Sequence, residues 1–254
     1  MDTKKKQTNL FGITIDNLNF DELISRITDL IDKKQKGYLV TPNVDHVVKL
    51  QKDSEFKKAY QAATITVADG VPIIWVSKLV RKPLKEKLSG SNIFPKLLPL
   101  AEKKGYSVFF LGASKKANYL AYQKIKKMHP KINIVGRYAP PFGFEKDENE
   151  QKKIANLINK TKPQMLFLFL GTPKQEKWIY NHYKELSFTT AFCLGASLDF
   201  VAGTSKRTPR FFEKIGFEWL WRLLIEPKRL FKRYIIDDFF PFLWLTIKEI
   251  MRKT

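Results

Sequence analysis

The sequence is poor in the residues that build covalent or metal cross-links. It has one cysteine among 254 residues, Cys193, so no disulfide can form within the chain. The three histidines have no metal-like spacing, and cysteine pairs are absent. No Gly-x-Gly-x-x-Gly follows a strand-like run, which argues against a nicotinamide dehydrogenase.

Long apolar runs are missing as well. None reaches the roughly 18 residues that a membrane-spanning helix needs. The first eight residues are polar and carry no signal-peptide core, so a reducing cytoplasm is expected, with Cys193 acting as a buried small hydrophobe. Acidic residues are few: 25 Asp and Glu stand against 46 Lys and Arg, for a net charge of +21. Such a surface favours nucleic acid, anionic lipid or phosphorylated partners.

The hydrophobic residues, 44% of the chain, are enough for a sizeable core. Six short apolar runs predict strands covered on both faces, and they alternate with helical periodicity. The class is therefore α/β, with a mainly parallel, Rossmann-like sheet flanked by helices. A short hairpin is expected around Leu10–Leu18. The predicted strands are 38–41, 65–68, 107–111, 132–135, 165–170 and 191–194, and the predicted helices lie near 20–34, 92–104, 114–128, 147–160 and 174–185.

Ligands of such sheets sit beyond the carboxyl ends of the strands. Six residues are predicted to follow a strand directly: Thr41, Asp69, Gly112, Gly136, Gly171 and Gly195. After Gly171, the sequence Gly-Thr-Pro-Lys-Gln-Glu-Lys-Trp predicts a turn that opens a helix, where backbone N–H groups can bind an anion. Lys174 and Gln175 can add side-chain donors.

The composition changes after Gly203. Residues 204–254 contain twelve Lys and Arg and six acids, a net +6, interleaved with Phe and Trp. We therefore divide the chain into an α/β domain, 1–203, and a helical appendage, 204–254, with helices near 208–225, 228–236 and 239–252 separated at Pro227 and Pro241. Basic and aromatic residues suit an anionic membrane surface. They also suit a single-stranded nucleic-acid-binding module. A membrane helix would gather Phe239 and Phe242 on one side, whereas a nucleic-acid groove would spread its aromatics along a sheet or channel.

Five motifs in this order resemble the WecG/TagA/CpsF family of bacterial glycosyltransferases, over roughly residues 9 to 235. They are Thr41–His46, Ala68–Pro72, Gly171–Trp178, Gly195–Gly203 and the pair Glu218–Leu223 with Glu226–Arg229. The resemblance implies an inverting transferase that moves N-acetylmannosamine, its uronic acid or glucose from a UDP-sugar. The acceptor would be a polyprenyl-diphosphate-linked sugar in cell-surface polysaccharide or teichoic acid synthesis.

The resemblance makes Asp69 the general base, whereas placement alone also fits a helix cap. Asp45 is the rival base, and His46 is expected to be a helix-start or core histidine. Thr41 and Asn43 would line the sugar pocket, Gln175 would lie near the diphosphate and Asp199 near the nucleotide base. Glu176 could pair with Lys174 or Lys177 at the surface. Gly112, Gly136, Gly171 and Tyr138 are further candidates for substrate binding, although Tyr138 could equally be core.

Asp-x-Asp, the pair on which many nucleotide-sugar transferases hold a divalent ion, is absent, so we expect no metal or other cofactor. Fixed arginines would then offset the charge of the leaving diphosphate, with Arg222, Arg229 and Arg233 as candidates. One segment departs from the family pattern: Lys87–Asn92 stands where many relatives have an Arg near the start and an Asp at the end. Peripheral attachment to the inner face of the cell membrane is expected, and a homo-oligomer is compatible with the sequence.

Overall fold

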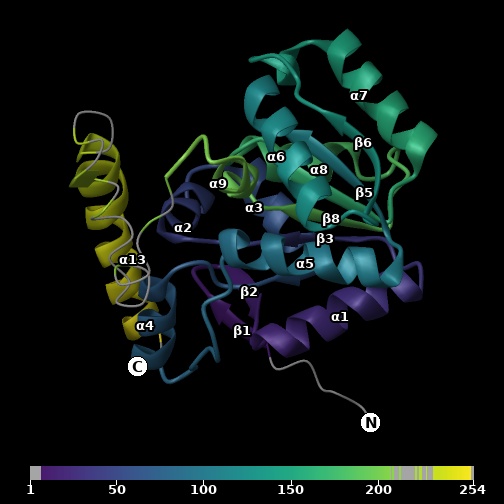
Figure 1. The fold of residues 1–254 in the computed structure, drawn as a ribbon. Helices are drawn as coiled ribbons and strands as arrows, with labels where there is room; N and C mark the ends of the chain where they lie inside the picture. The colour runs from purple at the N-terminus through teal and green to yellow at the C-terminus, as the bar shows by residue number, and fades with distance from the viewer. Residues whose placement is uncertain are drawn as a thin grey trace.

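A computed structural model describes residues 7–206, 208, 212, 221, 223–224, 227 and 231–252. Its centre is a six-stranded parallel sheet in the order β4-β3-β8-β7-β5-β6 (Figure 1). The α/β class, the parallel sheet and its six strands are thus confirmed. The strands are β3 (Gly37–Val40), β4 (Ile65–Thr66), β5 (Ser107–Gly112), β6 (Asn133–Tyr138), β7 (Met165–Phe169) and β8 (Thr190–Cys193).

Alternate residues of each strand enter two different cores, one on each face of the sheet. In β7, for example, Leu166 and Leu168 face one core and Phe167 and Phe169 the other. Both faces are apolar because helices cover both, which explains why the strands read as continuous apolar runs. The second core is aromatic: the Phe167 ring lies 4.9 Å from that of Phe192 and 5.1 Å from that of Phe94.

The helices follow the right-handed crossover rule of parallel sheets. Connections that run toward β4 cross one face, and β5–β6, which runs toward β6, crosses the other. The β4–β5 connection begins on the first face with α4 and continues on the second with α5. The first face carries α2 (Val44–Leu50), α3 (Ser54–Gln61), α4 (Val71–Leu79), α7 (Glu148–Thr161) and α8 (Lys174–His182). The second carries α1 (Phe20–Asp32), α5 (Gly90–Lys104), α6 (Lys115–Met128) and α9 (Ser197–Ala202), and a short 3₁₀ turn, η1 (Phe144–Lys146), precedes α7.

The predicted hairpin is also present, as β1 (Gln7–Leu10) and β2 (Ile13–Asp16). It covers the sheet edge beside β4. The Asp16 carboxylate accepts a hydrogen bond from the Thr66 N–H at 2.9 Å and pairs with Arg26 at 2.7 Å. An exposed edge strand is open to pairing with other chains, and Asp16 occupies one of the free donors of β4.

Residues 231–251 of the appendage form one helical run, and the break predicted at Pro241 is wrong. π-helical turns, η2 (Lys232–Phe239), lead directly into α13 (Phe240–Met251). Pro241 stands in the first turn of α13. Residues in this turn do not donate an N–H within the α-helix, so proline costs no α-helical hydrogen bond there. The wide preceding turns leave room for its ring.

Helix α13 docks on the body through one face. Leu245 is buried in the first core, and the Phe242 ring lies 5.5 Å from that of Phe11 at the hairpin tip. The Glu249 carboxylate accepts a hydrogen bond from the Phe11 N–H at 3.1 Å. Within the portion of the chain that the structure describes, no helix is both long and apolar enough to cross a bilayer.

Candidate active site

The strand order brings the ends of β4, β3, β8 and β7 together at one edge of the sheet (Figure 1). Asp69, Thr41, Gly195 and Gly171 follow these four strands in that order. Neighbouring strands lie about 4.8 Å apart, so the four turns span roughly 15 Å. Residues from four separate motifs therefore converge on one edge, as expected from the carboxyl-end rule.

Asp69 is fixed by the turn that follows β3. Its N–H donates to the Pro42 carbonyl at 2.8 Å, and its side chain is half-buried. Asn43 stands beside this turn: a Cβ added to Gly70 would lie 4.0 Å from the Asn43 Cβ. Asn43 also caps α2 by accepting the His46 N–H at 3.1 Å. A carboxylate, an amide and the buried Thr41 hydroxyl thus meet where the sequence predicted a sugar pocket.

The two neighbours of this group, Asp45 and His46, are both buried. Asp45 forms an ion pair with Lys49 at 2.7 Å. The His46 Nδ1 lies 2.6 Å from the Tyr60 hydroxyl, and its ring packs edge-on against Phe56 and Tyr60. His46 is therefore the helix-start and core histidine that was expected. An ion-paired, buried Asp45 is a poorer proton acceptor for a substrate than the half-buried Asp69.

Gln175 links two turns of this edge. Its side-chain carbonyl accepts the Gly195 N–H at 3.1 Å, and its amide donates to the Glu176 carboxylate at 2.8 Å. The side chain is 2% exposed. Gln175 thus holds the β7–α8 turn against the β8–α9 turn, a role that its position in the sequence did not reveal.

The expected surface pairing of Glu176 is wrong, because this side chain is fully buried. Lys174 pairs with Glu145 instead, and Lys177 pairs with Asp53 and Glu55. Burial raises the pKa of the Glu176 carboxyl to about 7. Its Oε2 has no hydrogen-bond partner among the described residues, although the buried Thr172 hydroxyl lies close enough to lower the pKa.

Several helices begin at this edge without a hydrogen bond between the N-cap side chain and their first backbone N–H groups. The N-cap residues of α4, α5 and α8 are Gly70, Ser89 and Pro173, and none of the three makes a side-chain cap hydrogen bond within the described structure. The N-cap residues of α2 and α6 both do. Backbone N–H groups of α5 and α8 therefore remain for an anion at this edge. The segment that departs from the family pattern, Lys87–Asn92, contains the start of α5.

Two candidates lie at the far end of the sheet. Gly136 is inside β6 rather than after it, and a Cβ there would lie 2.5 Å from the Phe109 ring. The Tyr138 hydroxyl donates to the Glu150 carboxylate and accepts from Lys153 at 2.5 Å. Five strand spacings, about 24 Å, separate β6 from β4. Gly136 and Tyr138 thus lie far from Asp69, in the strand at the opposite side of the sheet.

Gly112 ends β5, between these two regions. A Cβ on it would lie 2.5 Å from the Phe169 carbonyl oxygen, so the close approach of two backbones requires glycine. Asp199 lies on α9, next to the β8 turn. Burial raises the pKa of its carboxyl, which accepts a hydrogen bond from Thr204 at 3.2 Å.

The arginines proposed for the leaving group are not part of this geometry. Arg222 and Arg229 lie outside the described residues, and so does the side chain of Arg233. In the described ranges, no three His, Cys, Asp or Glu side chains converge as metal ligands do.

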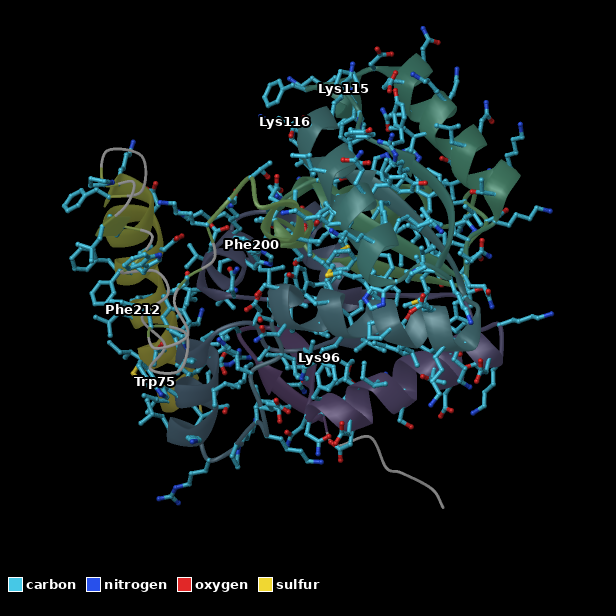
Figure 2. All side chains as sticks on the ribbon, in the orientation of Figure 1. Trp75, Lys96, Lys115, Lys116, Phe200 and Phe212 are labelled. Carbon is cyan, nitrogen blue, oxygen red and sulfur yellow. The ribbon has the colours of Figure 1, made fainter. Side chains whose placement is uncertain are left out.

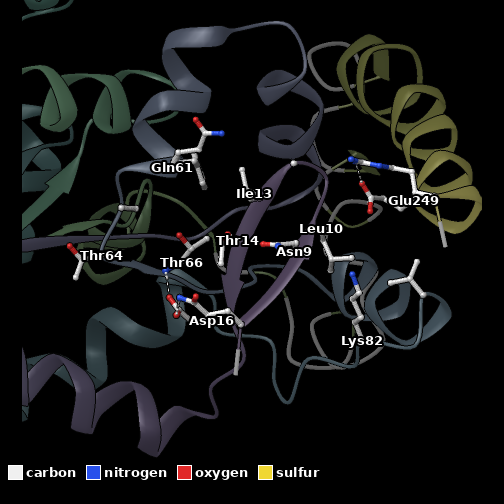
Figure 3. Close-up of a pocket in the computed structure, with 16 residues that line it drawn as sticks. Asn9, Leu10, Ile13, Thr14, Asp16, Gln61, Thr64, Thr66, Lys82 and Glu249 are labelled. Carbon is white, nitrogen blue, oxygen red and sulfur yellow. Dashed lines mark hydrogen bonds and ion pairs between the residues drawn. The ribbon is translucent and has the colours of Figure 1, made fainter. Parts of the chain in front are cut away.

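A cavity of about 730 Å³ opens elsewhere, between the hairpin, β4 and the end of α13 (Figure 3). Its lining includes Asn9, Thr14, Gln61, Lys82 and Arg252. None of the site residues predicted from the sequence lines it. The carboxyl edge, where the motifs converge, is the better candidate for the active site.

The model of the glycosyl transferase WecG/TagA/CpsF family matches residues 8–254. The chain belongs to this family. A relative from Bacillus spizizenii is 33% identical over 221 residues, which cover 85% of this chain and 84% of the relative. One from Staphylococcus aureus is 27% identical over 226 residues, or 88% and 87% of the two chains. Both are named N-acetylglucosaminyldiphosphoundecaprenol N-acetyl-beta-D-mannosaminyltransferase.

Proposed function

We propose that this family member transfers N-acetylmannosamine from a UDP-sugar to N-acetylglucosamine linked through diphosphate to undecaprenol. The names of the two relatives supply the sugar and the acceptor. The observation that carries the proposal is the turn holding Asp69 beside Thr41 and Asn43, since it combines a carboxylate with groups that recognise sugar hydroxyls. The product would enter teichoic acid or another cell-surface polysaccharide.

The proposed step is a single displacement. Asp69 accepts the proton of the attacking acceptor hydroxyl, and the hydroxyl oxygen forms a bond to the anomeric carbon of the donor. The bond from that carbon to the diphosphate oxygen breaks, and UDP leaves with the bonding electron pair. An α-linked donor then gives the β linkage that the relatives' names state, with inversion.

The leaving diphosphate must be stabilised as its charge develops. The start of α8 at the Gly171 turn and the start of α5 offer N–H donors at the same edge. Arg222, Arg229 and Arg233 would complete the site from the appendage. Lys87, in place of the arginine of many relatives, would contribute a point charge rather than a bidentate contact.

We further propose that the reaction needs no divalent ion, since the chain contains no Asp-x-Asp pair. Treatment with EDTA should leave the rate of the purified enzyme within about twofold of the untreated rate. Loss of activity with EDTA, followed by recovery with Mn²⁺ or Mg²⁺, would contradict this.

Undecaprenol keeps the acceptor in a bilayer, so the enzyme must work at a membrane surface. We propose that residues 204–254 form an appendage that attaches peripherally to the inner face of the cell membrane. In this appendage, Phe240 and Trp244 of α13 are exposed and lie on the same face of the helix. Phe239 is likewise exposed, whereas Phe242 packs inward on the hairpin, contrary to its predicted place on the same side. Aromatics on one helical face favour the membrane interpretation over a nucleic-acid groove.

The test is Asp69→Asn, assayed with UDP-N-acetylmannosamine and a lipid-linked N-acetylglucosamine acceptor. Loss of the general base should lower the rate by about 10²- to 10⁴-fold. Donor binding, measured as the rise in melting temperature with added donor, should stay near that of the wild type. Asp45→Asn is the matched control and should retain a rate closer to that of the wild type. Equal activity of Asp69→Asn and the wild type would remove Asp69 from its role.

A further inference from the structure

Helix α4 begins directly after the Asp69–Gly70 turn, and its outer face carries large apolar side chains. Trp75 and Leu79 stand four residues apart, on one side of the helix, and are 48% and 64% exposed. Ile73 and Val76 occupy the inner side and are buried. Side chains as large as these are seldom left together on the surface of a monomer without a partner.

Helix α13 presents a second apolar surface. Its outer stripe repeats at helical spacing and consists of Phe240, Leu243, Trp244, Ile247 and Met251, all well exposed. Phe242 and Leu245 hold the opposite side against the body. This helix is therefore apolar on both sides, and only one side is occupied by the rest of the described chain.

The two surfaces adjoin. Val76 of α4 and Leu245 of α13 belong to the same core, and Lys82 and Arg252, just beyond the ends of the two helices, line the same cavity. In Figure 1, α4 lies beside the C-terminal half of α13, and Figure 2 places Trp75 at this junction. The exposed apolar residues of α4 and α13 thus lie on either side of this junction, and together they are called here the α4–α13 face.

The rim of this face is basic. From Gly70 to Lys85 the sequence contains four Lys and Arg and no acid. Lys78, Arg81 and Lys82 are exposed. On α13, Lys248 stands over the Trp244 ring of the outer stripe at 5.1 Å. Arg252 pairs with Glu249 at 3.6 Å, and Glu249 is turned inward onto the Phe11 N–H. Asp237, just before α13, is an exposed acid. An apolar surface with a cationic rim is complementary to an anionic bilayer.

We propose that the α4–α13 face is the membrane-contacting surface, and that Trp75 and Leu79 of the catalytic body enter the lipid interface together with α13. This rests on the proposed function insofar as the acceptor is lipid-linked. Interfacial helices bury their apolar side about 5–10 Å into the headgroup region. Trp75 stands four residues into α4, roughly 6 Å along the helix from its start. The bilayer contact would therefore hold the Asp69 turn near the level at which the acceptor diphosphate emerges.

The proposal is tested on the full chain with the single variants Trp75→Ser and Leu79→Ser. The control is Met128→Ser, since Met128 is 58% exposed at the end of α6, outside the face. Binding is measured by co-sedimentation with vesicles of phosphatidylcholine and phosphatidylglycerol. Each test variant should bind at least about fivefold more weakly than the wild type, whereas Met128→Ser should bind equally. Circular dichroism melts verify that all three variants are folded.

Transfer to a water-soluble, short-chain acceptor is measured in parallel. Both test variants should retain the wild-type rate with it and lose rate only with the acceptor in vesicles. If the protein shows no transferase activity but its vesicle binding still depends on Trp75 and Leu79, the surface stands and the proposed function fails. Wild-type vesicle binding by both variants would overturn the surface. A change from dimer to monomer on light scattering, with vesicle binding unchanged, would overturn it in favour of a second copy of this chain.

Discussion

Glu176 shows how one buried carboxyl can tie stability to pH. Its neighbours come from every element packed around it: Tyr38 from β3, Lys49 from α2, Tyr60 from α3, Cys193 from β8, and Thr172 and Gln175 from its own turn. Burial outweighs the nearby lysine and the Gln175 hydrogen bond, so the pKa rises from its ordinary 4.5 to about 7. The folded chain therefore binds this proton more tightly than the unfolded chain does.

The stability that this proton contributes is fully present below about pH 4.5 and is lost as the pH rises through about 7. At about 1.4 kcal/mol per pKa unit, the total loss is about 3 kcal/mol. Gln cannot ionise, so the Glu176→Gln variant should not lose this stability as the pH rises. The free energy of unfolding of the variant, relative to that of the wild type, should therefore increase between pH 5 and pH 8. Denaturant melts at several pH values measure the difference. Glu148→Gln, on the exposed start of α7, is the control and should follow the wild-type curve.

At the scale of elements, the site depends on how two helix-opening turns are held together. Gln175 is the only described side chain that hydrogen-bonds both the β7–α8 region and the Gly195 N–H. Its amide has one further N–H for a ligand. Because both turns face the same edge, this bridge fixes the position of the α8 start relative to β8.

Gln175→Leu keeps the approximate volume but leaves the Gly195 N–H and the Glu176 carboxylate without this partner. Each buried group left unpaired costs about 1–3 kcal/mol. The free energy of unfolding should therefore fall by at least about 1 kcal/mol, and the KM for the donor should rise. Gln123→Leu, at an exposed position of α6, should change stability by less than about 0.5 kcal/mol. A Gln175→Leu enzyme with wild-type stability and KM would show that the bridge has no such role.

The sequence predicted the strands and the longer helices and missed several short helices. Continuous apolar runs identified all six strands, since strands covered on both faces alternate little in polarity. Helices α2, α3, α4 and α9 were not among the predicted helices, because six to nine residues hold too few turns for a clear period. Pro241 predicted a break that the π-helical turns avoid.

The sequence likewise placed only some residues of the candidate site. The sequence could place Thr41, Asn43 and Asp69 at neighbouring strand ends because the carboxyl-end rule needs only the strand positions. Gly136 and Tyr138 were grouped with them because one sequence does not reveal that β4 and β6 stand at opposite edges. The burial of Glu176 was missed because it depends on Tyr38 and Tyr60, which come from distant segments.

For the whole molecule, the decisive feature is that the candidate active-site edge and the basic appendage belong to one chain. Phe242, Leu245 and Glu249 of the appendage dock α13 on the hairpin and the first core. All six strands lie before residue 204. The sheet should thus form without the appendage, whereas catalysis should require the arginines that the appendage carries.

Arg229→Ala separates the two roles proposed for residues 204–254. If Arg229 stabilises the leaving diphosphate, its loss should lower the transfer rate by about 10²-fold, the scale of removing one charge-stabilising donor. Vesicle binding should change much less, since one cation near the surface contributes roughly 1 kcal/mol and salt weakens it. The control, Lys253→Ala, removes a cation outside the family motifs and should keep the rate. A chain ending at Gly203 should keep its sheet and a cooperative thermal melt and lose nearly all transfer, with vesicle binding reduced to the share of Trp75 and Leu79. The shortened chain lacks Arg222, Arg229 and Arg233. Normal turnover by it would show that transfer does not need these arginines.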